Sequence, residues 1–146
     1  MSGGRKNRRS KRVGGKFVML EEYLQKTASW RALDTVARCI FVEMLRCYNG
    51  HNNGEIAMSC RRAADLVNTT KSTAARALVT LQKHGFIRIA RQAQLVWRDG
   101  TRKRFATSYA LTHLPVGNAL PTKDFIRWTP DGTPNNVIPM RTGAVA

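Results

Sequence analysis

Acidic residues are scarce in this chain. Nine Asp and Glu stand against 25 Lys and Arg among 146 residues, so the formal net charge is +16 and the isoelectric point lies near 11.1. This excess of positive charge favours a polyanionic partner, most often nucleic acid, with an anionic membrane surface as the other candidate. The sequence also lacks any run of the ~18 apolar residues that a membrane-spanning helix needs. The basic N-terminus is not followed by an apolar run, so we expect no secretory signal and no membrane partner.

Residues that commonly carry catalysis or bind metals are also few and scattered. The three cysteines and three histidines are Cys39, Cys47, Cys60, His51, His84 and His113. An odd number of cysteines without tight spacing favours reduced thiols in a cytoplasmic core. No nucleophile motif, glycine-rich phosphate loop or metal cluster is present. We therefore expect no enzyme activity, no metal, no cofactor and no small-molecule effector.

Proline is absent from the first 114 residues, and this absence divides the chain. All five prolines lie between residues 115 and 139, so a largely irregular tail is expected over 113–146. One apolar and basic patch in that tail, residues 123–128, is expected to dock on the domain or on a second subunit. Residues 1–16 hold seven Lys or Arg and no acid, which predicts a disordered basic arm. A single domain is expected over 17–112.

Apolar spacing predicts three helices in this domain. Between Asp34 and Tyr48 the apolar residues recur at helical spacing, and Asn49-Gly50 ends the pattern. Two more helices follow, with Ser59 and Thr70 as their N-caps. The inner face of the first of them is expected to consist of Ala63, Ala64, Leu66 and Val67. The second of them runs over 70–84 with an apolar stripe and ends before Gly85. That stripe consists of Ala74, Ala77, Leu78 and Leu81. Residues 17–27 are expected to form a short helix or an extended segment, and 55–58 a short strand.

The pattern after Gly85 is that of strands. Residues 86–90 alternate apolar and basic side chains, and 94–97 form a second strand that ends in a tight turn at Asp99-Gly100. A basic run over 102–104 leads into a third strand over 105–112, with Phe105, Thr107, Tyr109 and Leu111 expected on one face. The predicted fold class is mainly α with a small β-hairpin, an α+β protein.

Residues 59–87 resemble the winged helix-turn-helix regions of bacterial transcriptional regulators and of plasmid or phage replication initiators. The resemblance consists of a serine-capped helix, a Ser/Thr/Lys-rich start of the next helix, an arginine one turn later and a Leu-x-x-Leu before Gly-Phe-Ile. The matching positions are Ser59, Ala64, residues 70–73, Arg76, Leu78, Leu81 and residues 85–87. The resemblance implies a winged helix-turn-helix whose second helix enters the major groove of DNA, with the hairpin as its wing.

The residues expected to contact DNA follow from this arrangement, because the N-terminal part of such a helix reaches base edges. Arg76 is expected to contact a guanine, with a phosphate contact as the alternative. Arg61 and Arg62 are expected to bind phosphate or to be solvated surface charges. The full set is Arg61, Arg62, Thr70, Lys71, Ser72, Thr73, Arg76, Arg98, Arg102, Lys103 and Arg104, together with Arg5, Lys6, Arg8 and Arg9 of the arm. The aromatic residues Phe86, Trp97, Phe105 and Tyr109 are expected in the core rather than stacked on bases.

The positive charge is concentrated in the segment that contains the two motif helices and the hairpin. Residues 61–104 contain eleven Lys and Arg and two Asp. This excess of positive charge equals the net charge of all residues after 16. We expect a sequence-specific double-stranded DNA-binding protein of the bacterial cytoplasm, associated with the nucleoid, that regulates transcription as a homodimer. The helix over 34–48 and the patch over 125–128 are the candidate dimer interfaces. The alternatives are a replication initiator or partition protein, an architectural protein and an RNA-binding protein.

Overall fold

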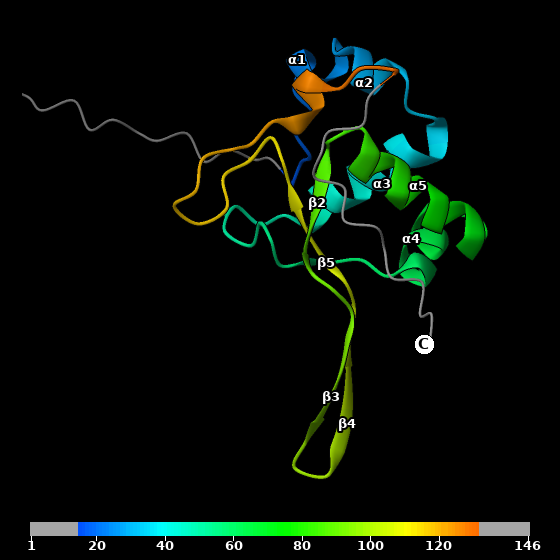
Figure 1. Cartoon of the computed structure of the whole chain (residues 1–146), viewed down its shortest axis with the longest axis vertical. Coiled ribbons are helices and arrows are strands. Elements are labelled where there is room, and N and C mark those ends of the chain that lie inside the picture. The colour runs from blue at the N-terminus through cyan, green and yellow to red at the C-terminus, as the bar shows by residue number, and fades with distance from the viewer. Residues whose placement is uncertain (1–14, 132–146) are drawn as a thin grey trace, which may run out of the picture.

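The computed structural model describes residues 15–131, and this part of the chain is α+β, as the sequence predicts (Figure 1). The helices are α1 (Glu22–Gln25), α2 (Ala28–Arg31), α3 (Thr35–Cys47), α4 (Cys60–Val67), α5 (Lys71–Lys83) and the 3-10 helix η1 (Asp124–Arg127). The strands are β1 (Ile56–Ala57), β2 (Ile87–Arg91), β3 (Gln94–Arg98), β4 (Thr101–Phe105) and β5 (Ser108–Leu111). None of these helices is long and apolar enough to cross a bilayer.

The helix boundaries follow from capping residues. The Asp34 carboxylate accepts a hydrogen bond from the amide of Ala37 at 2.7 Å and starts α3. Ser59 accepts from the amide of Arg62 at 3.1 Å and starts α4. Thr70 does the same for α5 through the amide of Thr73. The three longer helices predicted from the sequence are therefore confirmed, and Ser59 and Thr70 cap the last two of them, as expected.

The strands form two small antiparallel sheets, and β2 to β5 make up one long hairpin that contributes to both. The first has the order β1-β5-β2, and the second contains β3 and β4. A register shift between Ile89 and Arg91 interrupts β2 before the outer part of the hairpin begins. The amide of Ala93 donates to the Thr107 hydroxyl at 3.2 Å across this junction. As a result, β3 and β4 project beyond the helical part of the molecule (Figure 1).

The core lies between α3, α5 and the first sheet. Four aromatic rings meet there, with Phe41 edge-on to both Trp30 and Phe86 at centroid distances of 5.7 and 5.4 Å. Phe125 from η1 stacks on Phe86 at 5.0 Å. Aliphatic side chains complete the core around these rings, namely Ile40, Met44, Leu78, Leu81, Ile87 and Leu111. The apolar face of α3 and the apolar stripe of α5 are thus buried against each other, as the periodicity predicts.

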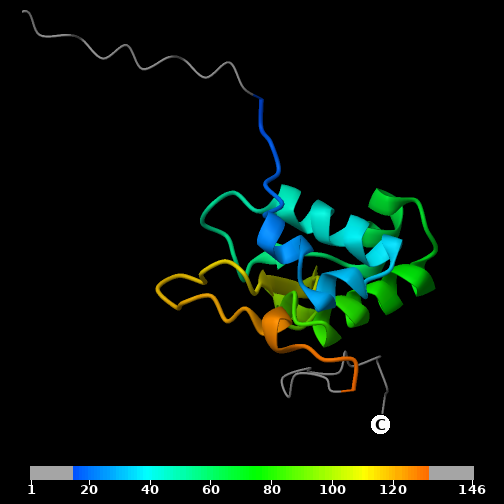
Figure 2. The same ribbon diagram turned by 90° about the horizontal axis from the view of Figure 1, so that it is seen from above.

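The segment after β5 returns along the domain and adds to its core (Figures 1 and 2). The Asp124 carboxylate pairs with Arg88 at 2.5 Å and with Arg127 at 2.9 Å, and the Asp124 side chain is only 4% exposed. The amide of Lys123 donates to the carbonyl of Thr112 at 2.9 Å. The patch at 123–128 therefore docks on its own chain, which is one of the two positions expected for it.

Three expectations about local structure are wrong. The basic run over 102–104 belongs to strand β4, and the strand predicted over 105–112 is broken at Ala106-Thr107, so Phe105 does not share a buried face with Tyr109. Leu66, expected on the inner face of its helix, is 40% exposed. Cys39 lies on the exposed face of α3 rather than in the core. Phe105, Leu66 and Cys39 are of types typical of an apolar face, but their positions direct them toward solvent.

Candidate nucleic-acid interface

Helices α4 and α5 are joined by a short polar turn. Asn68 adopts the left-handed conformation, with φ 55° and ψ 55°, and its amide donates to the carbonyl of Ala64. Asparagine tolerates this region better than most residues, so the chain reverses without glycine. Thr69 donates a second hydrogen bond to the same carbonyl at 3.0 Å. The turn thereby fixes the direction in which α5 leaves α4.

The faces of α5 are clearly divided. Its buried side chains are Ala74, Ala77, Leu78, Leu81 and Gln82. Lys71, Ser72 and Arg76 are exposed, and Thr73 is partly buried. No described residue forms a hydrogen bond or an ion pair with the side chain of Lys71 or Arg76. The structure therefore places these predicted contact residues on the outer face of the first two turns, as expected.

The hydroxyl of Thr70 has a local role. It accepts from the amide of Thr73 at 3.3 Å and lies 2.8 Å from the Thr73 hydroxyl and 3.2 Å from that of Ser72. These contacts use most of the bonding capacity of the Thr70 hydroxyl. Thr70 therefore positions the start of α5, and Lys71, Ser72 and Arg76 present the more available groups.

The projecting hairpin carries the largest group of exposed basic residues among the predicted contact residues. Arg98, Arg102, Lys103 and Arg104 are all exposed, and their side chains form no hydrogen bond or ion pair within residues 15–131. Asp99 and Gly100 form its tip with φ values of 52° and 72°. Two successive residues with positive φ are the signature of the turn that best matches strand twist in a two-residue hairpin. The predicted Asp-Gly turn is thus confirmed, with the basic residues on both strands beside it.

A groove connects α4, α5 and the base of the hairpin. It has a volume of about 540 Å³, and its lining includes Arg61, Lys71 and Arg104 together with Phe105 and Thr107. The three cations come from three different elements, and the strand that carries Arg104 is distant in the sequence from the two helices. The structure therefore brings together one predicted contact residue from each of the first motif helix, the second motif helix and the hairpin.

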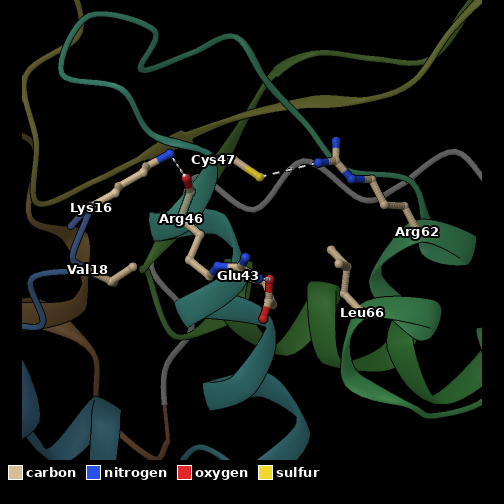
Figure 3. A pocket seen from close by; sticks show the side chains of 7 residues that line it. All are labelled: Lys16, Val18, Glu43, Arg46, Cys47, Arg62 and Leu66. Carbon is tan, nitrogen blue, oxygen red and sulfur yellow. Dashed lines mark hydrogen bonds and ion pairs between the residues drawn. The ribbon is translucent and has the colours of Figure 1, made fainter.

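The Arg62 side chain does not line this groove. Its guanidinium donates to the carbonyl of Ala57 at 3.1 Å and to Cys47 Sγ at 3.5 Å, as Figure 3 shows for the second contact. It lines a separate cavity of about 470 Å³ between α3 and α4, where Lys16 donates to the carbonyl of Arg46 at 3.0 Å. The exposed Arg62 guanidinium thus has two contacts within the fold, and the phosphate contact expected of it stays a prediction. Its neighbour Arg61 is the residue at this end of α4 that lines the larger groove.

The aromatic residues divide into two groups, and the prediction that all four lie in the core is wrong for two. Phe86 and Tyr109 are fully buried, whereas Trp97 is 69% exposed and Phe105 is 42% exposed. Trp97 and Phe105 lie on the projecting hairpin, where the helices do not cover them. Arg91 packs over the Phe105 ring at 5.8 Å. Sequence composition carries no signal for this difference, because it depends on how far the hairpin extends.

The buried histidine of the domain does not belong to this surface. His113 packs against Phe41 at a centroid distance of 5.7 Å. Burial, with a smaller contribution from the nearby Lys123, lowers the pKa of His113 to about 4. His84 stacks on Trp128 at 4.6 Å, and burial lowers its pKa as well. His113 thus packs against α3 and His84 against the returning segment, and neither lines the groove.

The remaining predicted contact residues, Arg5, Lys6, Arg8 and Arg9, lie outside the described residues. Comparison with known proteins adds no further information about the site. No family model, curated protein or solved structure matches this chain.

Proposed function

We propose that this chain is a winged helix-turn-helix protein that binds double-stranded DNA in a sequence-specific manner. In this proposal α4 and α5 form the helix-turn-helix, and the hairpin of β3 and β4 is the wing. The start of α5 enters the major groove, where Lys71, Ser72 and Arg76 face base edges. Arg61 and the basic side chains of the hairpin bind the flanking phosphates. The biological role that fits best is transcriptional regulation in a bacterium.

One observation carries this proposal. Arg61, Lys71 and Arg104 line a single groove although they come from α4, α5 and β4. A cluster of cations without acidic partners raises the free energy of the isolated protein through mutual repulsion, and a polyanion relieves that repulsion. The exposed start of α5 lies at the same groove, so phosphate binding would bring base edges within reach of Arg76.

Arg76 is the residue that best supports sequence-specific binding. It is exposed on the second turn of α5, and its backbone carbonyl accepts from the Thr80 hydroxyl at 2.9 Å. Its guanidinium has no competing partner among residues 15–131. A planar guanidinium donates two parallel hydrogen bonds to the O6 and N7 atoms of guanine, which no other base offers in the major groove. We therefore propose that Arg76 reads a guanine.

The test is a titration of the full chain against three labelled ligands of matched length: duplex DNA, single-stranded DNA and duplex RNA. Each is measured by fluorescence anisotropy over a series of salt concentrations. We expect duplex DNA to bind most tightly, with log affinity falling linearly with log salt because counterions are released. Tighter binding of RNA would contradict the proposal. Selection from a pool of random duplexes then gives the preferred sequence, and failure to enrich any sequence favours an architectural role.

The homodimer stays a prediction, and part of its expected interface is buried within the fold. The apolar face of α3 and the side chain of Phe125 are buried within one chain, so neither is available to a second copy, whereas Ile126 of the same patch is 58% exposed. Further exposed apolar side chains lie on the entry segment, at Phe17 and Met19. Light scattering of the full chain and of a double variant, Phe17→Ser with Met19→Ser, measures whether a dimer forms and whether this segment contributes.

A further inference from the structure

The hairpin of β3 and β4 has two different faces. Directly opposed residues of antiparallel strands share a face, and alternate residues of one strand share a face. Leu95 pairs with Arg104, and Trp97 pairs with Arg102. These four residues therefore form one side of the hairpin, which we call the Trp97 face. The opposite side contains Val96, Lys103 and Phe105.

The Trp97 face leaves large apolar side chains in water. Trp97 is 69% exposed and Leu95 is 45% exposed, although tryptophan normally contributes more buried area than any other residue type. The other two tryptophans are used within the fold. Trp30 packs against Phe41 and Phe86, and Trp128 stacks on His84. Trp97 is therefore the tryptophan available to a partner.

The charges on this face indicate what kind of partner it fits. Arg102 and Arg104 flank the two apolar side chains, and the nearest acid on the hairpin is Asp99 at its tip. A protein partner would have to neutralise both guanidinium groups with acids while covering an indole. A nucleic acid meets both requirements, because its phosphates neutralise the guanidinium groups and its base faces and sugars cover the indole. Charge complementarity thus favours DNA over a second copy of this basic chain.

We propose that Trp97 is a wedge that contacts the bases of duplex DNA from the minor groove and opens one base step. This inference rests on the proposed function and extends it, since it assigns base contact to the hairpin in addition to phosphate binding. Arg102 and Arg104 are attracted by the negative potential of the minor groove and hold the hairpin in it. The indole, with Leu95 beside it, then replaces part of the stacking that it disrupts. The base step opened most easily is a flexible pyrimidine–purine step such as TA.

Three variants of the full chain test this proposal: Trp97→Ala, Trp97→Phe and Leu120→Ala. Leu120 is an exposed apolar residue outside the hairpin, so Leu120→Ala is the matched control for loss of surface apolar area. Affinity is measured with a labelled duplex that contains a central TA step. We expect Trp97→Ala to weaken binding by roughly five- to 150-fold, the range for loss of one aromatic–base stack. Trp97→Phe should retain most of the affinity, and Leu120→Ala should equal the unmodified chain.

Two further measurements distinguish a wedge from a passive contact. Tryptophan emission should be quenched by the duplex in the unmodified chain, and the quenching should be largely absent in Trp97→Phe. Energy transfer between dyes on the duplex ends should rise on binding, because the wedge bends DNA, and should not rise with Trp97→Ala. The wedge is refuted, while the proposed function stands, if the duplex binds without quenching tryptophan emission or raising energy transfer, and Trp97→Ala binds it as tightly as the unmodified chain does. If the unmodified chain does not bind the duplex at all, both are refuted.

Discussion

Lys71, the first residue of α5, and Arg104, on strand β4 of the hairpin, line the same groove. They are separated by 33 positions in the sequence numbering, and neither forms a hydrogen bond or an ion pair with a described residue. Arg61 reaches this groove from the start of α4. The fold thus assembles one basic surface from three elements.

Replacing Arg76 should reduce sequence discrimination more than it reduces binding. We expect Arg76→Ala to lower the affinity for the preferred duplex by about 1–3 kcal/mol and to relax the preference at one base pair. Affinities for preferred and scrambled duplexes, measured by gel shift, provide the comparison. Arg31→Ala is the matched control, because Arg31 is exposed on α2, at the end of the molecule opposite the hairpin (Figure 1). Unchanged affinities for both duplexes would show that α5 is not the recognition helix.

The basic N-terminal arm should contribute to affinity without contributing to sequence preference. Residues 1–14 contain six Lys and Arg. Their removal, with Lys16 kept because it hydrogen-bonds the last turn of α3, should weaken binding to every duplex. The slope of log affinity against log salt should become shallower by ~0.9 for each phosphate that the shortened chain no longer neutralises. A Gly/Ser segment of the same length in place of residues 1–14 is the control for chain length. An unchanged slope would exclude a role of the arm in DNA binding.

Gly85 should tolerate no side chain. It has a φ of +82°, and a Cβ atom built on it would lie 2.6 Å from the carbonyl carbon of Asp124 and from the amide nitrogen of Phe125. Gly85→Ala should therefore lower the free energy of unfolding by roughly 2 kcal/mol or more, measured by urea denaturation. Gly50 also has a positive φ, of +100°, but no atom within 4 Å of its position for a Cβ. Gly50→Ala thus measures the backbone strain alone, and an equal effect of both variants would mean that Asp124 and Phe125 do not pack on Gly85.

Much of the fold could be predicted from the sequence because it depends on local chemistry. Asp34, Ser59 and Thr70 cap helices through hydrogen bonds within three residues, and Asp99-Gly100 makes a turn from its own backbone preferences. The exposed start of α5 followed in the same way from the apolar spacing of the helix. Such features require no knowledge of what packs against them.

The remaining features depend on partners that are distant in the sequence. Arg62 points to Cys47 across 15 positions, and Arg88 pairs with Asp124 across 36 positions. The exposure of Trp97 follows from the projection of the hairpin beyond the helices. Residue type alone predicts a phosphate contact or a solvated surface charge for Arg62 and a core position for Trp97, and it gives no partner for Arg88. Only the tertiary structure distinguishes these roles.

Acid should destabilise the fold through His113. Burial and Lys123 lower its pKa to about 4, whereas the pKa of an unfolded histidine is ~6.5. The unfolded chain therefore binds more protons between these values, and the free energy of unfolding should fall as the pH falls through that window. The loss should approach about 3 kcal/mol at pH 4. Urea denaturation at several pH values should show a flatter profile for His113→Gln. His51, which is exposed, is the control site, and equal profiles for His113→Gln and the unmodified chain would contradict this role.

The most direct test of the central claim is to locate bound DNA on the protein. Backbone amide chemical shifts of the isotope-labelled full chain are recorded while the selected duplex is added. The proposal predicts the largest shift changes at Arg61, at residues 71–76 and at residues 95–104, with little change in α1 and α2. If the duplex binds and the largest changes fall instead on α1, α2 or residues 113–131, the groove between α5 and the hairpin is not the DNA-binding surface.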